Sequence, residues 1–371
     1  LTGFPNYPGG KIYAGYRQRP FQFEDIEGIS VVRVPLIPDH SSSAFLRILC
    51  YLSLTLTMCV PGLFLVQKPD VVHVYQGSAT LALPAMLMRF FRRVPYVLDV
   101  QDLWPESVTS SGMLKHVWFE SFLNFWCKMT YKYAQKIVVL SPGYRDVLIE
   151  RGVRAEKIEV VYNWCDENQA TDTILTGPVS DIFKAACFTV VYAGNLGVVQ
   201  RLDAVLGAAE ILKVQCPEVR FAFIGDGVDS ERLKSVAVEK KLDNVVFVPR
   251  QPSSNIGAIL ARADALLIHL RDDPLCRVGI PQKTQAYMAA GRPVIVGVKG
   301  NAADIVLAAE AGLFCEPENP SSIAETILQL QKLPPEELEK MAQNGRSYYQ
   351  KKLSFAVGSK QMESVFEGCF K

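Results

Sequence analysis

The chain has 371 residues, of which 49% are hydrophobic, and its formal net charge is +1. That length exceeds what one ordinary hydrophobic core supports, so we expect two domains of a globular protein rather than a disordered or fibrous chain. The near-neutral charge gives no reason to expect a nucleic-acid partner. Charge is uneven, because residues 1–165 carry 17 Lys and Arg against 13 Asp and Glu, which makes the first half mildly basic.

Short β-branched runs alternate with helical stretches along most of the chain, a pattern typical of parallel sheets joined by crossover helices. The strands predicted in the first half are Ile29–Pro35, Pro69–Tyr75, Pro95–Val100, Lys136–Leu140 and Ile158–Tyr162. Those predicted in the second half are Phe188–Ala193, Val219–Ile224, Val245–Val248, Ala265–Leu270, Val294–Val298 and Leu313–Glu316. We therefore expect two doubly wound α/β domains over residues 1–163 and 188–354, with a linker over 164–187. A C-terminal helix at about 355–371 is expected to pack back on the first domain.

The nine cysteines are scattered, with no C-x-x-C spacing and no paired histidines nearby. This pattern argues against a zinc site and a disulfide framework and favours a reducing cytoplasm. The opening stretch LTGFPNYPGG is loop-like and lacks the pattern of a signal peptide. We therefore expect a cytoplasmic protein.

The first strand of the second half runs into a glycine turn and an amphipathic helix, in the stretch VVYAGNLGVVQRLDAVLGAAEIL. Gly194 and Gly197 would let the backbone approach a phosphate closely, and the N-terminus of the following helix favours negative charge. A glycine turn alone is weak evidence, because many α/β turns need glycine for geometry. In FIGDG, Phe223 to Gly227, a tight turn is the better interpretation.

A second anion motif lies in PQKTQAYMAAGRPVIV, where Pro281 suits the first helical position and Gly291 the cap after the last turn. Lys283 in the first turn adds a full positive charge to a helix N-terminus that already attracts anions. Taken alone, the stretch fits a capped surface helix with a solvated lysine. In a doubly wound sheet, however, both motifs fall at the carboxyl edge of the strands, where ligands bind, and two such motifs indicate a diphosphate.

The motifs AGNLG, FIGDG, VFVPRQPSSNIGAILARADALLIHLRDDPL and PQKTQAYMAAGRPVIV together resemble glycosyltransferase family 4, whose members are retaining enzymes of GT-B fold that use nucleotide sugars. In the first half, LTGFPNYP, DVQDLWPES, VVLSPGY and VVYNWCDE resemble the branch that builds bacterial surface polysaccharides, in particular N-acetyl-L-fucosamine transferases. The resemblance covers nearly the whole chain. It is specific for the family and much less so for the sugar.

The resemblance implies a nucleotide-diphosphate sugar, with UDP the expected nucleotide, as donor substrate for the second domain. The donor-binding residues carried over are Gly194, Asn195, Gly197, Arg201, Arg250, Arg277, Gln282, Lys283 and Thr284. Asp102 and Glu106 follow a first-half strand and are the candidate catalytic carboxylates on the acceptor side; capping of a turn is an equal alternative for Asp102. No Asp-x-Asp pair or Cys/His cluster is placed to hold a metal ion against a diphosphate, so we expect no metal and no other cofactor.

Two glutamates that the family usually carries eight positions apart are absent, because these positions are Val278 and Ala286. Asp272 and Asp273 lie nearby and are candidates to substitute for them, although capping of a loop is an equal alternative. The usual Arg and Lys of the glycine turn are replaced by Asn195 and Gln200. The remaining cations would be Lys283, Arg201 and Arg277.

Members of the family begin with a strand, a glycine-rich turn, a helix and a further strand before the counterpart of LTGFPNYP. We therefore expect the first domain to lack its N-terminal strand-helix unit, either because the sequence is truncated or because another polypeptide supplies that unit. Loss of a central first strand would expose its neighbours.

The stretch Ala44–Val66 is long and apolar enough to suggest a transmembrane helix. The flanking strands Ile29–Pro35 and Pro69–Tyr75 should share one sheet, which excludes a single span and leaves a buried crossover helix or a helix in the bilayer interface. The basic bias of this half and the segments MRFFRR and WFESFLNFWCKMTYKY favour the interface. The expected location is the inner face of the membrane, as a peripheral protein.

These observations predict a glycosyltransferase that moves a sugar with retention to a lipid-linked or glycan acceptor in surface polysaccharide synthesis, such as that of lipopolysaccharide. Arg201, Arg277 and Lys283 would stabilise the departing diphosphate. Three alternatives stay open: a sugar-nucleotide epimerase of similar two-domain form, a non-catalytic nucleotide-binding relative, and an enzyme completed by a partner polypeptide.

Overall fold

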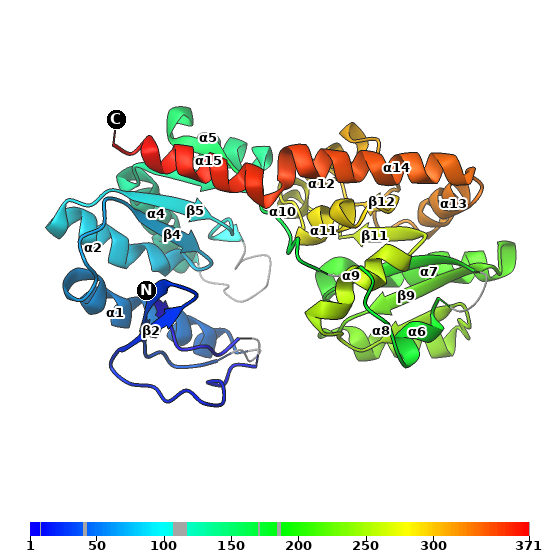
Figure 1. The fold of residues 1–371 in the computed structure, drawn as a ribbon, viewed down its shortest axis with the longest axis horizontal. Helices are drawn as coiled ribbons and strands as arrows, with labels where there is room; N and C mark the ends of the chain where they lie inside the picture. The colour runs from blue at the N-terminus through cyan, green and yellow to red at the C-terminus, as the bar shows by residue number, and fades with distance from the viewer. Residues whose placement is uncertain (8, 40–42, 107–116, 170, 184–186, 371) are drawn as a thin grey trace. The chain divides into compact units, whose positions relative to one another are not determined.

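The computed structural model describes residues 1–7, 9–39, 43–106, 117–169, 171–183 and 187–370, and the chain forms two compact units (Figure 1). Unit 1 comprises Leu1–Leu140, Tyr144–Val161 and Met362–Lys371, whereas unit 2 comprises Ser141–Gly143 and Tyr162–Gln361. Each contains a parallel sheet with crossover helices. The predicted class, two Rossmann-like α/β domains, is confirmed.

Unit 2 is built on six parallel strands in the spatial order β10-β9-β8-β11-β12-β13. Their bounds are β8 Phe188–Ala193, β9 Val219–Ile224, β10 Val245–Val248, β11 Ala265–His269, β12 Val294–Gly297 and β13 Gly312–Phe314. Continuous apolar runs such as ALLIH suit strands that are buried on both faces. The chain winds outward from β8 in one direction and then crosses to β11, so the switch point of the topology lies between these two neighbours, where such sheets bind ligands.

Helices cover both faces of this sheet. The main core of unit 2 lies between one face and the helices α7 (Leu202–Gln215), α8 (Ser230–Glu239) and α13 (Pro320–Gln331). The remaining elements are α6 Pro178–Asp181, η3 Val198–Gln200, α9 Ser253–Arg262, α10 Pro274–Val278, α11 Gln282–Ala290, α12 Asn301–Ala308, α14 Pro335–Tyr348 and η4 Tyr349–Leu353. The segment 164–187, predicted as a linker, belongs to unit 2 and includes α6, where Val179 is buried.

The last helix, α15 (Phe355–Glu367), begins in unit 2, and its residues from Met362 onward belong to unit 1. There Val365 and Cys369 pack against Val97, Val138 and Val161, which come from the strands of unit 1 and the end of β7. These contacts make the C-terminus part of the hydrophobic core of unit 1.

The larger sheet of unit 1 contains four parallel strands in the order β4-β5-β6-β7. Their bounds are β4 Val72–Gln76, β5 Tyr96–Val100, β6 Lys136–Val139 and β7 Ile158–Val160. Its helices are η1 Ala79–Ala82, α2 Leu83–Arg92, α4 Val117–Tyr133, α5 Pro142–Glu150 and η2 Ala155–Lys157. All five residues of β5 are buried, which identifies β5 as the centre of this sheet.

A second, three-stranded sheet in unit 1 has the order β1-β3-β2, with β1 Thr2–Gly3, β2 Gln22–Ile26 and β3 Ile29–Val34. The antiparallel hairpin of β2 and β3 was not predicted, although Glu27 and Gly28 both adopt positive φ, as a two-residue hairpin turn requires. The prediction that the strands flanking Ala44–Val66 share a sheet is wrong. β3 pairs with β1 and β2, and among the described strands β4 pairs only with β5.

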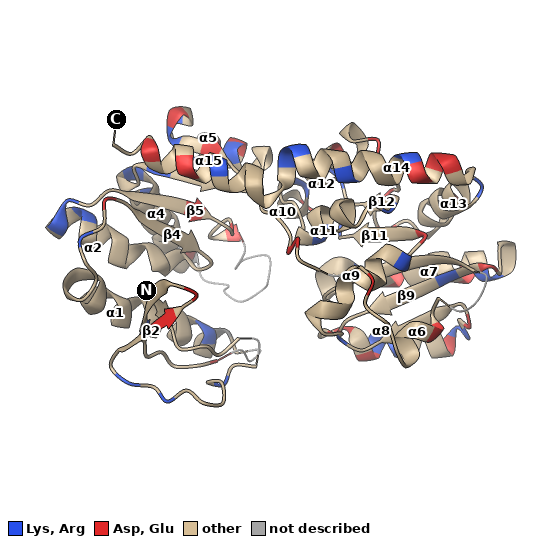
Figure 2. Ribbon diagram, in the orientation of Figure 1, with Lys and Arg blue, Asp and Glu red and all other residues tan. Residues whose placement is uncertain are grey.

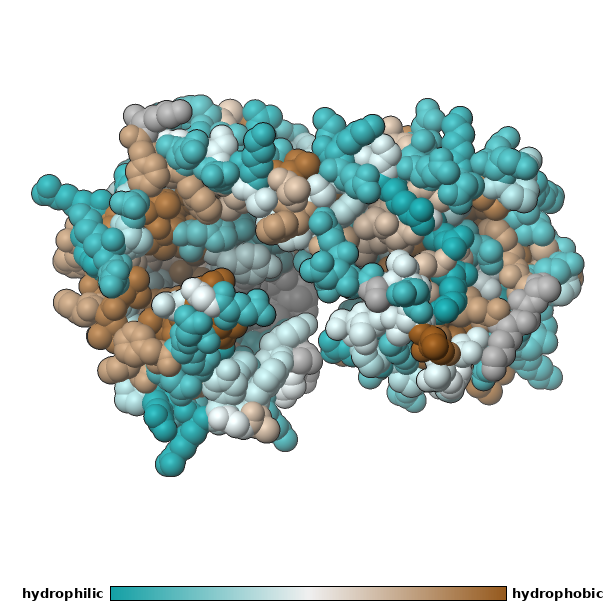
Figure 3. Space-filling view, viewed as in Figure 1, coloured by the Kyte–Doolittle hydropathy of each residue, from teal (hydrophilic) through white to brown (hydrophobic). Residues whose placement is uncertain are grey.

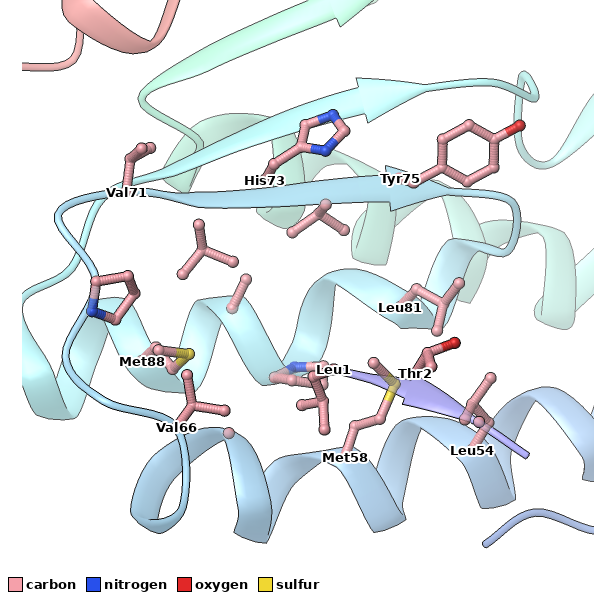
Figure 4. A pocket seen from close by; sticks show the side chains of 17 residues that line it. Leu1, Thr2, Leu54, Met58, Val66, Val71, His73, Tyr75, Leu81 and Met88 are labelled. Atoms are coloured by element: carbon pink, nitrogen blue, oxygen red, sulfur yellow. The ribbon is translucent and has the colours of Figure 1, made fainter. Parts of the chain in front are cut away.

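An apolar cavity of about 450 Å³ lies beside the open edge of β4 (Figure 4). It is lined by side chains of Leu54 and Met58 from α1, Met88 from α2 and Leu1, which precedes β1. Val72 N–H donates to Pro95 O of the β5 side, so the backbone groups of the alternate residues His73 and Tyr75 face the opposite side, away from β5. The sheet thus ends at β4 next to an apolar hollow.

Helix α1 (Ala44–Phe64) is the one described helix that is long and apolar enough to cross a bilayer by length and composition. Only 22% of its most apolar window is buried, so α1 is not a fully buried helix within the described part of the chain. Its exposed large apolar side chains lie on one broad face and comprise Phe45, Leu46, Leu52, Leu56, Val60 and Phe64. Figure 3 shows apolar atoms gathered over α1 and α2 on one face of unit 1.

Candidate donor-binding site

The glycine turn that follows β8 lies at the switch point of unit 2. Gly194 has φ +141°, a conformation that only glycine adopts readily. Gly225, after β9, packs so closely that a Cβ there would lie 1.9 Å from the carbonyl oxygen of Gly194. The two glycines therefore hold the ends of β8 and β9 against each other. FIGDG provides the tight turn predicted for it.

Helix α11 is fixed to the same strand end by Tyr287, which is buried. Its hydroxyl oxygen accepts a hydrogen bond from Ala193 N at 2.8 Å and donates one to Ala193 O at 3.2 Å. The helix ends at Gly291, whose φ is +62°, as the sequence predicts. Pro281 is the N-cap rather than the first helical residue, one position from the prediction. The helix N-terminus is thereby held at the carboxyl end of β8.

Lys283, in the first turn of α11, is the central group of the site. Its Nζ lies 3.7 Å from the ring centroid of Tyr192 and would be 3.4 Å from a Cβ placed on Gly194. Nζ is buried, and no described residue provides it with a hydrogen-bond partner. Burial lowers the pKa of Lys283 to about 7. An amine so placed lacks the counter-charge that a buried ammonium needs, and a bound anion would supply it.

Arg201 reaches the same edge from the N-cap of α7. Its φ is +46°, so the helix starts on a left-handed residue behind the 3₁₀ turn η3 rather than directly behind the glycine turn. Its Nε lies 2.8 Å from Oε1 of Glu318, which follows β13. The Arg201 side chain as a whole is 43% exposed and so stays partly accessible to a ligand while it is paired.

His269 ends β11 and is completely buried between η3 and the loop that follows β13. Its Nδ1 lies 2.8 Å from Gln200 O, and its Nε2 accepts from Glu318 N at 3.1 Å. Burial lowers the pKa of His269, which keeps the ring neutral. The histidine thereby bridges η3 to the loop after β13.

The two aspartates proposed as substitutes for the absent glutamates have different roles. Asp273 caps α10 by accepting from Cys276 N at 2.9 Å. Asp272 accepts from Arg277 Nε at 2.7 Å and lies 3.1 Å from Lys299 Nζ, and these cations lower the pKa of Asp272 to about 2. Asp273 is thus the loop cap weighed as an alternative, and Arg277 is held in an ion pair.

The other predicted donor residues divide into two groups. Near the glycine turn, Gly197 N donates to Gln200 Oε1 at 3.1 Å, and exposed Asn195 accepts from the Tyr192 hydroxyl through its backbone oxygen at 2.8 Å. Further away in the chain, Arg250 is exposed just beyond β10, and Gln282 is exposed at the first position of α11. Thr284 is completely buried, and no described residue pairs with its Oγ1.

The candidate catalytic carboxylates lie in unit 1, just after β5. Glu106 lies 2.5 Å from Arg151 Nη2, and the same arginine donates through Nη1 to Trp104 O at 2.7 Å. The side chain of Asp102 is exposed, yet the protein around it removes enough water to raise its pKa. Arg151 therefore fixes the turn that carries both carboxylates.

Sequence reasoning missed Tyr192, Tyr287, His269 and Glu318. The histidine had a signal, because a lone polar residue ends the otherwise apolar strand ALLIH at the ligand-binding edge. Glu318 had none, since its role depends on a left-handed backbone, φ +58°, in a loop distant in sequence from the glycine turn.

Two family models match the chain. The model of "Glycosyl transferases group 1" matches residues 184–348, and that of "Glycosyl transferase 4-like domain" matches residues 11–164. The matches are separated by residues 165–183, and they correspond to most of unit 2 and most of unit 1. The chain belongs to the GT-B glycosyltransferases. The enzyme is of the family 4 type, and the resemblance noted in its motifs is confirmed to that level.

Curated relatives of this glycosyltransferase include "Probable glycosyltransferase WbjE" of Pseudomonas aeruginosa, which is 25% identical over 70% of the chain and 66% of its own length. "Putative colanic acid biosynthesis glycosyl transferase WcaI" of Escherichia coli is 24% identical over 85% of the chain and 77% of its own length. The chain thus spans about two thirds of the first of these relatives.

Solved structures share the fold of the enzyme. Anabaena Alr3699/HepE in complex with UDP and glucose aligns with a TM-score of 0.67 at 16% identity, over 92% of the chain and 86% of its own. Sucrose-phosphate synthase from Thermosynechococcus elongatus aligns with a TM-score of 0.69 at 15% identity, over 91% and 83%.

Proposed function

We propose that the enzyme transfers a sugar from a nucleotide-diphosphate sugar, with UDP as the nucleotide, to a lipid-linked or glycan acceptor in surface polysaccharide synthesis. The observation that carries this proposal is Lys283 Nζ, a buried amine without a described hydrogen-bond partner, beside the glycine turn at the switch point of unit 2. The names of the relatives WbjE and WcaI and the UDP in the HepE structures support it.

The proposed reaction breaks the bond between the anomeric carbon of the donor sugar and the diphosphate oxygen. A glycosidic bond to an acceptor hydroxyl oxygen forms on the same face, so configuration is retained, and the hydroxyl proton leaves with the nucleoside diphosphate or to solvent. Lys283 and Arg201 would neutralise the charge that develops on the departing phosphate, the usual task of such cations. No metal ion takes part in this proposal, so activity is expected to survive EDTA. Loss of activity that Mn²⁺ restores would refute the metal-free mechanism.

The test of donor chemistry is turnover of a panel of UDP-, GDP- and dTDP-sugars with product detection, together with calorimetric titration of UDP. Lys283→Ala is expected to weaken UDP binding by roughly 1.5–3 kcal/mol, the range for hydrogen bonds to charged groups. Lys340→Ala, on the exposed face of α14, is the matched control and should bind UDP as the wild type does. Unchanged affinity in the Lys283 variant would remove the diphosphate assignment.

For the acceptor side, we propose that unit 1 docks on the inner face of the membrane, as a peripheral protein, through α1 and the end of α2. The exposed fractions are 72% for Phe45, 62% for Leu56 and 76% for Phe64 on α1, and 74% for Phe91 on α2. Arginines cluster at the end of α2 (Figure 2), and each basic residue near an anionic surface adds about 1 kcal/mol of attraction. Burial of an apolar face beside cations is how interfacial helices bind.

Vesicle sedimentation tests this docking. The protein is expected to sediment with phosphatidylglycerol vesicles and to be released as salt rises, because salt screens the attraction. The double variant Leu56→Gln, Val60→Gln should sediment less while it binds UDP normally. Arg93→Glu is a better charge reversal than Arg92→Glu, because Arg92 Nη1 donates to Val66 O at 2.8 Å and so supports the end of α1. Equal sedimentation with neutral and anionic vesicles, or none with either, would refute the proposal.

A further inference from the structure

His269 has a defined protonation pattern because both of its ring nitrogens face backbone groups. A backbone carbonyl only accepts and a backbone N–H only donates, so Nδ1 must carry the proton that goes to Gln200 O, and Nε2 must be the acceptor for Glu318 N. The neutral Nδ1–H form is therefore the one form that satisfies both contacts. Protonation of Nε2 would set two donors against each other.

The two backbone segments that His269 bridges both determine the place of Arg201. Gln200, whose carbonyl accepts the histidine proton, immediately precedes Arg201, and Arg201 adopts the left-handed region at φ +46°. Glu318, whose N–H donates to the histidine, is also left-handed at φ +58°, and its Oε1 lies 2.8 Å from Arg201 Nε. Non-glycine residues hold such a backbone only when their surroundings impose it. One buried ring thus contacts the backbone of Glu318 and the backbone of the residue that precedes Arg201.

The remaining contacts of Glu318 and of the ring confirm that neither is free to move. Glu318 Oε2 accepts from Asp272 N at 3.0 Å. On the far side of the ring, a Cβ on Gly297 of β12 would lie 2.6 Å from His269 Cδ2, so the strand packs directly against it. The pair and its histidine form a fixed assembly at the switch point.

We infer that His269 is a positioning residue for donor binding: through Gln200 and Glu318 it sets the guanidinium of Arg201 beside the glycine turn. This inference rests on the proposed function and adds to it a residue outside the donor-binding set that sequence and family resemblance provide. Arg201 touches the diphosphate; His269 acts only through Arg201.

Two substitutions each remove one of the two hydrogen bonds that His269 makes. His269→Asn retains a short donor toward Gln200 O and loses the acceptor for Glu318 N, whereas His269→Gln retains a longer acceptor and loses the donor. Both are expected to weaken UDP binding about tenfold, the effect of losing one hydrogen bond to a charged group. Arg201→Ala is expected to weaken binding by a similar factor. Adding either His269 substitution to Arg201→Ala should weaken binding no further, since the histidine would have nothing left to position.

The binding measurements use calorimetric titration of UDP, with thermal unfolding to confirm that each variant is folded. A matched control is Lys340→Ala on α14, which should leave UDP affinity unchanged both alone and in combination with either His269 variant. If the His269 and Arg201 effects multiply instead, the histidine has a general structural role and the inference is overturned. If the wild type binds no UDP, the proposed function itself fails and the inference falls with it.

A ligand-free measurement tests the geometry separately. Long-range ¹H–¹⁵N correlation NMR distinguishes the two neutral forms of histidine, and His269 is expected to show a protonated Nδ1 and an unprotonated Nε2 near neutral pH. The charged groups that face it are Glu318 on the loop after β13, Asp203 in the first turn of α7 and Lys283 on α11. The opposite form, or a doubly protonated ring near neutral pH, would overturn the inference.

Discussion

Replacing Lys283 with methionine should make the free enzyme more stable while it abolishes tight donor binding. The amine is buried beside Tyr192 without a described partner, and its pKa is lowered from 10.5 to about 7. The unfolded chain binds a proton at this residue more tightly than the folded chain does. At neutral pH the protonated lysine therefore lowers the free energy of unfolding. Methionine has a similar length and no charge to bury.

The size of the effect follows from the pKa difference. A lowering of three to four pH units corresponds to about 5 kcal/mol at 1.36 kcal/mol per unit, which is the upper limit of the gain at pH 7 and below. Between pH 7 and about 10.5 the folded wild type is neutral while the unfolded chain is still protonated. Its stability relative to the variant should therefore rise by about 1.4 kcal/mol per pH unit in that window. The advantage of Lys283→Met is largest at pH 7 and disappears toward pH 10.

Thermal unfolding of both proteins from pH 6 to pH 9.5, followed by calorimetry, measures this directly. For a unit of this size, 1 kcal/mol corresponds to about 2–4 °C, so a gain of up to about 10–20 °C is expected at pH 7. Lys340→Met provides the control, because that side chain lies exposed on α14 and its loss should leave the pH dependence unchanged. A variant that is less stable than the wild type at pH 7, or whose advantage grows with pH, would refute the assignment of Lys283 as a strained anion-binding amine.

Three further results are expected. Gly225→Ala should destabilise unit 2 by about 3 kcal/mol or more, because the new Cβ would meet Gly194 O at 1.9 Å on a residue with φ +144°. Gly9→Ala is the control, since a Cβ there meets nothing within 4 Å. Equal unfolding temperatures for the two variants would contradict this prediction. Val365→Ala should lower the stability of unit 1 by about 2 kcal/mol and leave UDP affinity unchanged, which unfolding and titration measure together. Glu106→Gln should slow transfer about a hundredfold at unchanged UDP affinity if the carboxylate is catalytic, and full activity would exclude it.

The strands of unit 2 were predictable because a parallel sheet buried on both faces requires continuous apolar runs. The predicted Phe188–Ala193, Val219–Ile224 and Val245–Val248 coincide with β8, β9 and β10. The glycine turn and Lys283 could be singled out from the sequence because phosphate chemistry constrains residue types locally, at a strand end and a helix start. Residue requirements of this kind can be recognised within a single short segment of the sequence.

The contacts that escaped prediction depend on segments distant in the sequence. The His269 bridge joins η3 to the loop after β13, and no spacing rule relates these positions. The hairpin of β2 and β3 escaped because QFEDI has polar residues at most positions and only a two-residue turn marks it. The sheet assignment of β3 and β4 was wrong for a third reason: strand periodicity says which residues form strands, and not which strands pair.

The edge of β4 that lacks a strand partner among the described residues also has a consequence for strand pairing. A strand with unpaired backbone groups along one side accepts a strand from another molecule, and natural proteins usually blunt such edges with charge, proline or a covering segment. At this edge His73 and Tyr75 present their backbone to an apolar hollow, and none of the described residues that line it is lysine, arginine, aspartate or glutamate. In the described part of the chain, β4 is therefore a place where this sheet can accept a further strand, whether from the same chain or from another molecule.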